Sequence, residues 1–227
     1  MKLETKHIWG LAACLYFIGA GNAVAEVVFD GTIGSQPGLV NGELLVDVNN
    51  TYNITEDLGL PVGSNLFHSL LDFNVESNKI ASFTHSTAQV DNIIARVTGG
   101  NLTSIYGGLK SDASLWLMNP NGIIVGDGAF VDVKGSLYMS SADKVNFEQG
   151  VSFDMDATDA EVGLLTFDPV GFGFLDTTPF IIDSQNPSIS IDLAPAANPE
   201  GQGRLIITQQ TESINLVGSG IEIKNGI

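Results

Sequence analysis

Four carboxylates at Asp154, Asp156, Asp159 and Glu161 are spaced in a way that resembles a calcium-binding loop. Calcium prefers several carboxylate oxygens presented at short intervals along the chain. An EF-hand loop, however, needs glycine at its sixth position, where this sequence has Asp159, and the glycine-rich nonapeptide of calcium β-rolls is also absent. We therefore expect an exposed acidic loop here and no metal site.

Side chains that could act as a catalytic base are sparse. His68 and His85 have no partner His, Cys or paired carboxylate at ligand spacing, so we expect His68 to be a hydrogen-bonded or half-exposed histidine. A G-x-S-x-G elbow and a phosphate-binding loop are both absent. The sequence therefore predicts a non-enzymatic protein with no catalytic residue and no cofactor. A glycosidase-like carboxylate pair stays open among the 26 acidic residues, which leaves a β-helix polysaccharide-acting enzyme as an alternative.

The run Asn119-Pro120-Asn121-Gly122 separates two apolar segments, 114–118 and 123–125. Pro120 lacks a backbone donor and fixes φ, so it interrupts a central strand. Asn121-Gly122 suits a tight turn with positive φ at both central positions. The pattern predicts two short strands joined by a corner, followed by a further turn over 126–128.

Similar short runs recur along the chain and favour an all-β protein built from stacked coils. The segment 65–74 (NLFHSLLDFN) is the exception, because its apolar residues crowd one side at helical spacing, and we expect a short helix there with Phe67, Leu70 and Phe73 in the core. Further strands are expected at 51–55, 79–84, 90–97, 129–133, 145–147, 180–183, 188–193, 205–208, 213–217 and 221–223.

Composition agrees with such coils and excludes some partners. The chain has 26 glycines, only nine Lys and Arg residues and a net charge of −17 at pH 7. An acidic chain is repelled by phosphate backbones, so we expect no nucleic-acid partner. Arg96 is one of two arginines, and we expect it to clamp backbone carbonyls or an acidic neighbour.

The sequence resembles the N-terminal secretion domain of filamentous haemagglutinin-type exoproteins, the TpsA-type passengers of two-partner secretion. The resemblance covers residues 26–175 and is strongest over 65–175. It is carried by 97–109 (VTGGNLTSIYGGL), 117–126 (LMNPNGIIVG) and 135–137, with 65–69 upstream and 172–175 (FGFL) downstream.

This resemblance implies a right-handed parallel β-helix with an N-terminal cap and extra-helical β-hairpins, recognised by an Omp85-type (TpsB-like) outer-membrane transporter. It points to a secretion motif at Asn119, Pro120, Asn121, Gly122 and Ile123, supported by Gly99, Gly100 and Asn101. The same residues have a simpler interpretation, in which they only make the turn that lets a coil close. Direct adhesion to a host glycan or matrix is an alternative function.

The first 25 residues have the pattern of a secretory signal peptide, with Lys2 and Lys6, an apolar run over 8–20, and a cleavage site at Ala23 and Ala25. A lipoprotein box ending at Cys14 is the alternative. We expect a monomeric secretion domain over 26–227, secreted or at the cell surface, without a transmembrane segment after cleavage. Because such exoproteins run on much further, the passenger is expected to be truncated after residue 227.

Overall fold

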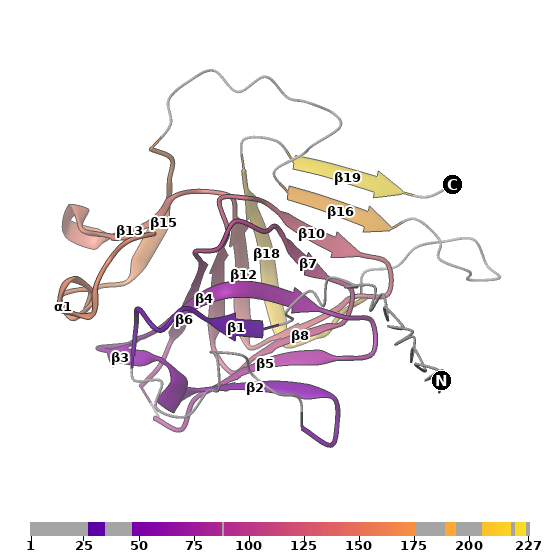
Figure 1. Ribbon diagram of the computed structural model, residues 1–227, viewed down its shortest axis with the longest axis horizontal. Coiled ribbons are helices and arrows are strands. Elements are labelled where there is room, and N and C mark those ends of the chain that lie inside the picture. Colours follow the sequence, from indigo (N-terminus) through magenta and orange to yellow (C-terminus); the bar gives the residue numbers. More distant parts are fainter. Residues whose placement is uncertain are drawn as a thin grey trace, which may run out of the picture.

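The computed structural model of the protein describes residues 27–34, 47–87, 89–175, 189–193, 206–218 and 221–225. Strands dominate these residues, and most of them pair in parallel with strands from far away in the sequence. They form three ladders that wrap around one apolar interior (Figure 1).

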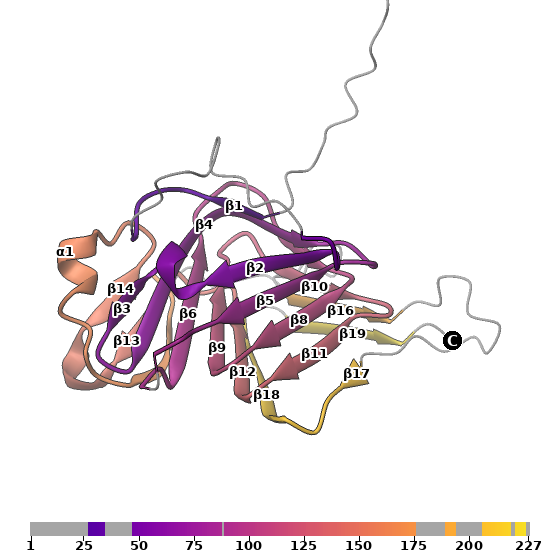
Figure 2. The ribbon, with the colours of Figure 1, turned by 90° about the horizontal axis from the view of Figure 1, so that it is seen from below.

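We call the three ladders sheets A, B and C. Sheet A runs in the order β18 (Thr211–Val217), β12 (Gly135–Ser140), β9 (Ser114–Met118), β6 (Asn92–Val97) and β4 (Asn65–Val75). Sheet B runs in the order β17 (Ile206–Ile207), β11 (Phe130–Val133), β8 (Gly108–Ser111), β5 (Ile80–Thr84) and β2 (Thr51–Thr55), and Figure 2 shows it face-on. Sheet C continues from the end of β4 through β7 (Thr103–Ile105), β10 (Ile123–Gly126), β16 (Ile189–Leu193) and β19 (Ile221–Asn225).

The chain passes from sheet A to C to B and back to A in each coil, as in the succession β6, β7, β8 and then β9. Asn92 lies opposite Ser114, and Leu115 lies opposite Leu137, so these coils take about 22 residues each. Their strands are parallel throughout. The expected right-handed parallel β-helix is confirmed.

Alternating side chains of each strand fill the interior. In β9, Leu115 and Leu117 point into the coil, while Trp116 and Met118 point outward, and all four are buried. A strand covered on both faces has no polar face to show, which explains the continuous apolar run at 115–118. The predicted strands at 51–55 and 114–118 are confirmed at those bounds.

Two short strands cap the N-terminal end of the β-helix. β1 (Val27–Phe29) and β3 (Leu60–Val62) both pair antiparallel with β4. They occupy backbone groups that would otherwise form an open sheet edge, which is a site of unwanted pairing between chains. The expected N-terminal cap is confirmed.

A separate antiparallel sheet lies outside the coils, on the outer face of sheet A, and we call residues 144–173 the hairpin module. It contains β13 (Lys144–Phe147), the 3₁₀ turn η3 (Glu148–Gly150), β14 (Ser152–Asp154), the helical turn α1 (Asp159–Val162) and β15 (Pro169–Gly173). Figure 1 shows it at one end of the molecule. The expected extra-helical hairpin is confirmed, and a second apolar core lies between it and sheet A.

The helix predicted over 65–74 is wrong, because this segment is the long strand β4. Opposite β1, Val28 pairs with Asp72 but Phe29 pairs with Leu70, so β4 carries a β-bulge there. The extra residue puts Leu70 and Phe73 on the same inward side three positions apart, which imitates helical spacing. The prediction that Phe67, Leu70 and Phe73 belong to the core is confirmed, since all are fully buried.

Some predictions concern residues outside the described ranges. These are the signal peptide over 1–25 with Ala23 and Ala25, Cys14, and the strand at 180–183. The strand expected at 188–193 is confirmed as β16, and those near 206, 214 and 222 as β17, β18 and β19. In the part of the chain that the structure describes, no helix has the length and apolar character needed to span a membrane.

Candidate functional site

The turn from Asn119 to Gly122 is the corner at which one coil leaves sheet A, through β9, and enters sheet C, through β10. The Gly122 amide donates to the Asn119 carbonyl at 3.0 Å, Pro120 occupies the second turn position, and Gly122 has φ of +108°. The predicted positive φ at Asn121 is wrong. The flanking strands belong to different sheets and do not pair, so the corner has no need of a primed hairpin turn.

Asn119 is fully buried and ties this corner to the coil below it. Its amide nitrogen donates to the Asn101 carbonyl and to Thr103 Oγ1, both at 3.0 Å. Its amide oxygen accepts the Asn121 backbone N–H at 2.9 Å. Because aspartate offers only acceptors when ionised, no other common residue of this size could donate and accept in this arrangement.

The neighbouring asparagines make the same kind of link. Asn121 Nδ2 donates to the Gly99 carbonyl at 2.7 Å, and Asn101 Nδ2 donates to Asp72 Oδ1 at 2.8 Å. The Asn119 backbone N–H donates to the Ser140 carbonyl of the next coil at 2.9 Å. We call this chain of contacts at successive A-to-C corners the corner ladder.

The two adjacent glycines of the predicted motif, Gly99 and Gly100, differ in the space around them. A Cβ on Gly99 would lie 2.1 Å from the Leu71 carbonyl oxygen, so only glycine fits where the two backbones meet. A Cβ on Gly100 would meet nothing within 4 Å. The structure therefore brings predicted secretion-motif residues together at the corner ladder, and of Gly99 and Gly100 it gives a packing reason only for Gly99.

Exposure divides the motif into two groups. Asn119, Gly122 and Ile123 are buried, whereas Asn121 and Asn101 are exposed. A partner that binds the folded domain could reach only the exposed group. The buried residues could meet a partner only before the coil closes.

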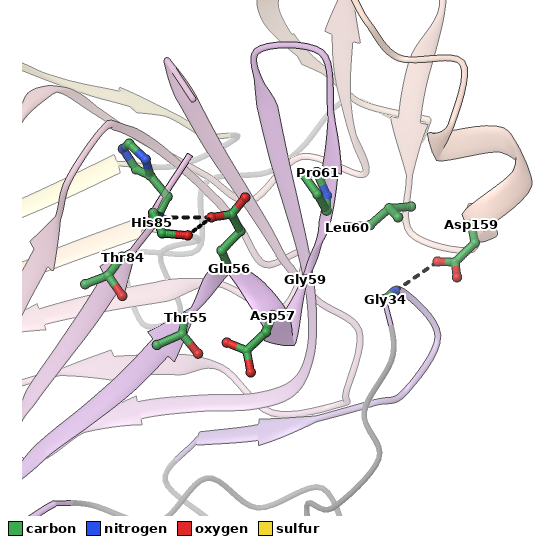
Figure 3. A pocket seen from close by; sticks show the side chains of 11 residues that line it. Gly34, Thr55, Glu56, Asp57, Gly59, Leu60, Pro61, Thr84, His85 and Asp159 are labelled. Carbon is green, nitrogen blue, oxygen red and sulfur yellow. Dashed lines mark hydrogen bonds between the residues drawn. The ribbon is translucent and has the colours of Figure 1, made fainter. Parts of the chain in front are cut away.

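A cleft of about 870 Å³ lies between the N-terminal cap and sheet B (Figure 3). Glu56 of the 3₁₀ turn η2 (Glu56–Leu58) accepts hydrogen bonds from the backbone and hydroxyl groups of Ser86 and Thr87, which lowers its pKa to about 2. On the other side, Asp159 Oδ1 accepts the Gly34 N–H at 3.0 Å. A glycosidase general acid needs a raised pKa, so Glu56 is unsuited to that role.

The acidic segment after β14 forms the helical turn α1. The Glu161 carboxylate accepts hydrogen bonds from the backbone N–H and the hydroxyl of Thr158, at 2.9 and 2.8 Å, which lowers its pKa. This is one half of a capping box, at the start of α1. The residues that the structure describes contain no group of three His, Cys, Asp or Glu side chains placed to hold a metal ion.

Arg96 makes the predicted clamp on backbone carbonyls, which is confirmed. It is buried, and its guanidinium donates to the carbonyls of Asp154 and Ala157 at 2.6 and 2.9 Å. It also donates to Ser69 Oγ at 2.7 Å and to Thr32 Oγ1 at 2.9 Å. The sequence did not single out Asn65, but its side-chain amide also donates to backbone carbonyls, those of Leu165 and Phe167, about a hundred positions later.

The expectation for His68 is wrong on both counts, because the residue is fully buried and neither ring nitrogen makes a hydrogen bond of good geometry. Its ring packs edge-on between Phe29 and Phe83, with centroids 6.2 and 5.8 Å away. Burial lowers the pKa of His68 to about 4, and the backbone of Leu58 and the charge of Asp57 offset this only in part. No spacing signal distinguishes such a histidine in the sequence.

Comparison with known proteins agrees with this architecture. Residues 26–226 match the TPS secretion domain family. A stretch of 65 residues, 28% of this chain, is 40% identical to the heme/hemopexin-binding protein of Haemophilus influenzae, but it spans only 7% of that relative's length. No solved structure matches the chain. The chain belongs to the family of TPS (two-partner secretion) secretion domains.

Proposed function

We propose that this chain is the N-terminal secretion module of an exoprotein, that an Omp85-type transporter in the outer membrane recognises it, and that it folds as a β-helix at the cell surface. The observation that carries the proposal is the family match over 26–226, which spans the entire described β-helix. In two-partner secretion such a domain is the part of the passenger that its transporter recognises.

The burial pattern at the corner supports recognition of an unfolded segment. Asn119 and Ile123 are buried in the closed coil, so a transporter that contacts them must do so while the chain is still extended. An extended segment can add as a strand to an exposed sheet edge of a partner, with side-chain pockets providing specificity. We therefore assign 119–123 to initial recognition and the corner ladder to the folded product.

Secretion with the cognate transporter tests the proposal. Asn121→Asp puts a carboxylate in place of an amide within the segment 119–123, which the transporter would meet in extended form, and we expect less secreted protein in the medium. In the folded protein the same change removes the donor to the Gly99 carbonyl. Asn53→Asp is the matched control, because Asn53 is also an exposed asparagine whose amide donates to a neighbouring side chain, but it lies in β2. We expect that variant to be secreted normally.

Unfolding in urea separates recognition from folding. If Asn121→Asp lowers secretion while its unfolding midpoint equals that of Asn53→Asp, the loss lies in recognition. If secretion of Asn121→Asp is unchanged, the assignment of 119–123 to the transporter is wrong.

A further inference from the structure

The hairpin module touches the β-helix through side chains and not through strand pairing. β13 pairs with β14 and β15, and these three strands form a sheet of their own. The module follows β12 in the sequence, but it lies against β4, β6 and β9, which come much earlier (Figure 1). Residues of the module therefore cover the outer face of strands that precede them in the chain.

The apolar part of this contact covers three successive coils. Phe67 of β4, Ile94 of β6 and Trp116 of β9 point outward from sheet A and are nevertheless buried. Phe153 of the module lies edge-on to Phe67, with ring centroids 5.0 Å apart, and Phe172 lies 5.3 Å from Trp116. Without the module, water would reach this row of large apolar side chains.

The polar part of the contact consists of hydrogen bonds from Arg96 and Asn65 of sheet A to carbonyl groups of the module. Arg96 Nη1 and Nη2 donate to the carbonyls of Asp154 and Ala157, which lie 58 and 61 residues later in the chain. Asn65 Nδ2 donates to the carbonyls of Leu165 and Phe167, at 3.0 and 2.7 Å, which lie 100 and 102 residues later. A buried polar group without its partner is strongly unfavourable, so these side chains cannot be buried until the later segment arrives.

We infer that the hairpin module is a latch: β4 and β6 become stable only when residues 144–173 dock on the outer face of sheet A. The first coils and the module then form one cooperative unit, although the strands from β7 to β12 separate them in sequence. Folding does not proceed rung by rung from the N-terminal end. If the proposed export route holds, the first coils stay open to a transporter until the module has emerged.

Native-state hydrogen exchange on the purified full chain, with no transporter present, tests the latch. Phe153→Ala removes the ring that packs on Phe67, and Phe153→Leu is a milder variant in case the first does not fold. We expect exchange to accelerate by the same factor at the amides of β4, β6 and the module. Phe130→Ala in β11, a half-buried aromatic residue of a later coil, is the control and should not accelerate exchange in the module.

If Phe153→Leu loosens the module alone and leaves β4 and β6 protected as in the unmodified chain, the module is an appendage and the inference is overturned. Pulsed exchange during refolding gives a second measurement. Protection of residues 65–75 and 92–97 should appear in the same phase as that of 144–173, and earlier protection of the two strands would also overturn the latch. Neither result depends on secretion, so failure of the latch and failure of the proposed function are distinguishable.

Discussion

The buried His68 makes the stability of this protein depend on pH between about 4 and 6.5. Its pKa is about 4 in the folded protein, against about 6.5 for an unperturbed histidine. The unfolded chain therefore binds a proton more readily than the folded one between these values. Stability is fully present above pH 6.5 and is lost as pH falls towards 4.

The size of the effect follows from the two pKa values. At pH 5.0 an unfolded His68 is protonated about 30-fold over its neutral form, whereas in the folded protein the protonated form is about a tenth of the neutral one. At about 1.4 kcal/mol per tenfold, the free energy of unfolding should fall by about 2 kcal/mol between pH 7.5 and pH 5.0. The carboxyl groups with lowered pKa contribute only at more acidic pH.

Urea unfolding at pH 7.5 and 5.0 measures this difference. His68→Leu puts an apolar side chain of similar volume in place of the imidazole between Phe29 and Phe83, and it should abolish most of the pH dependence. His85→Gln, at the half-buried histidine whose Nδ1 bonds the Thr87 carbonyl, is the control and should retain it. If the unmodified chain and His68→Leu lose the same stability at pH 5.0, the attribution to His68 is refuted.

Three further outcomes follow from contacts described above. Gly99→Ala should destabilise the fold by about 2 kcal/mol or more, because the added Cβ would meet the Leu71 carbonyl. Gly100→Ala, where a Cβ meets nothing, should change stability by less than about 0.5 kcal/mol, and thermal unfolding compares the two variants. The lowered pKa of Glu56 contributes stability that is lost as pH falls towards 2. Glu56→Gln should therefore make stability less sensitive to acid below pH 4.5, which acid unfolding curves measure. Arg96→Lys should cost about 3 kcal/mol by urea unfolding, because one ammonium cannot replace donors directed at four acceptors.

Local patterns in the sequence are enough to predict the strands and the corners, but not all of their geometry. The strands at 51–55 and 114–118 were predictable because turn residues bound short apolar runs. The bulge in β4 was not, because an extra residue in a strand produces the same apolar spacing as a helix. The turn type at Asn121 was mistaken because it depends on whether the flanking strands pair.

The candidate site shows the same division. Its residue types and its location at a corner were readable, as was the clamp made by Arg96 on carbonyl groups. The partners of Asn65 lie 100 and 102 residues away, and nothing in the local sequence announces them. Likewise, His68 is enclosed by Phe29 of the cap strand β1 and Phe83 of β5, which the topology brings to either side of its ring.

The placement of the hairpin module also bears on how such proteins can change. The ladder of sheet A continues from β12 to β18 with the chain having left the coil in between, and β10 still pairs with β16 after that excursion. The junction after Ser140 thus tolerates a large insertion, because β18 still pairs with β12 in parallel after it, in continuous register from Ser136 to Ser140 and with an irregularity only at Gly135. A foreign peptide grafted at the tip between β13 and β14 would extend outward while every rung keeps its neighbours, which makes that tip a practical point for display.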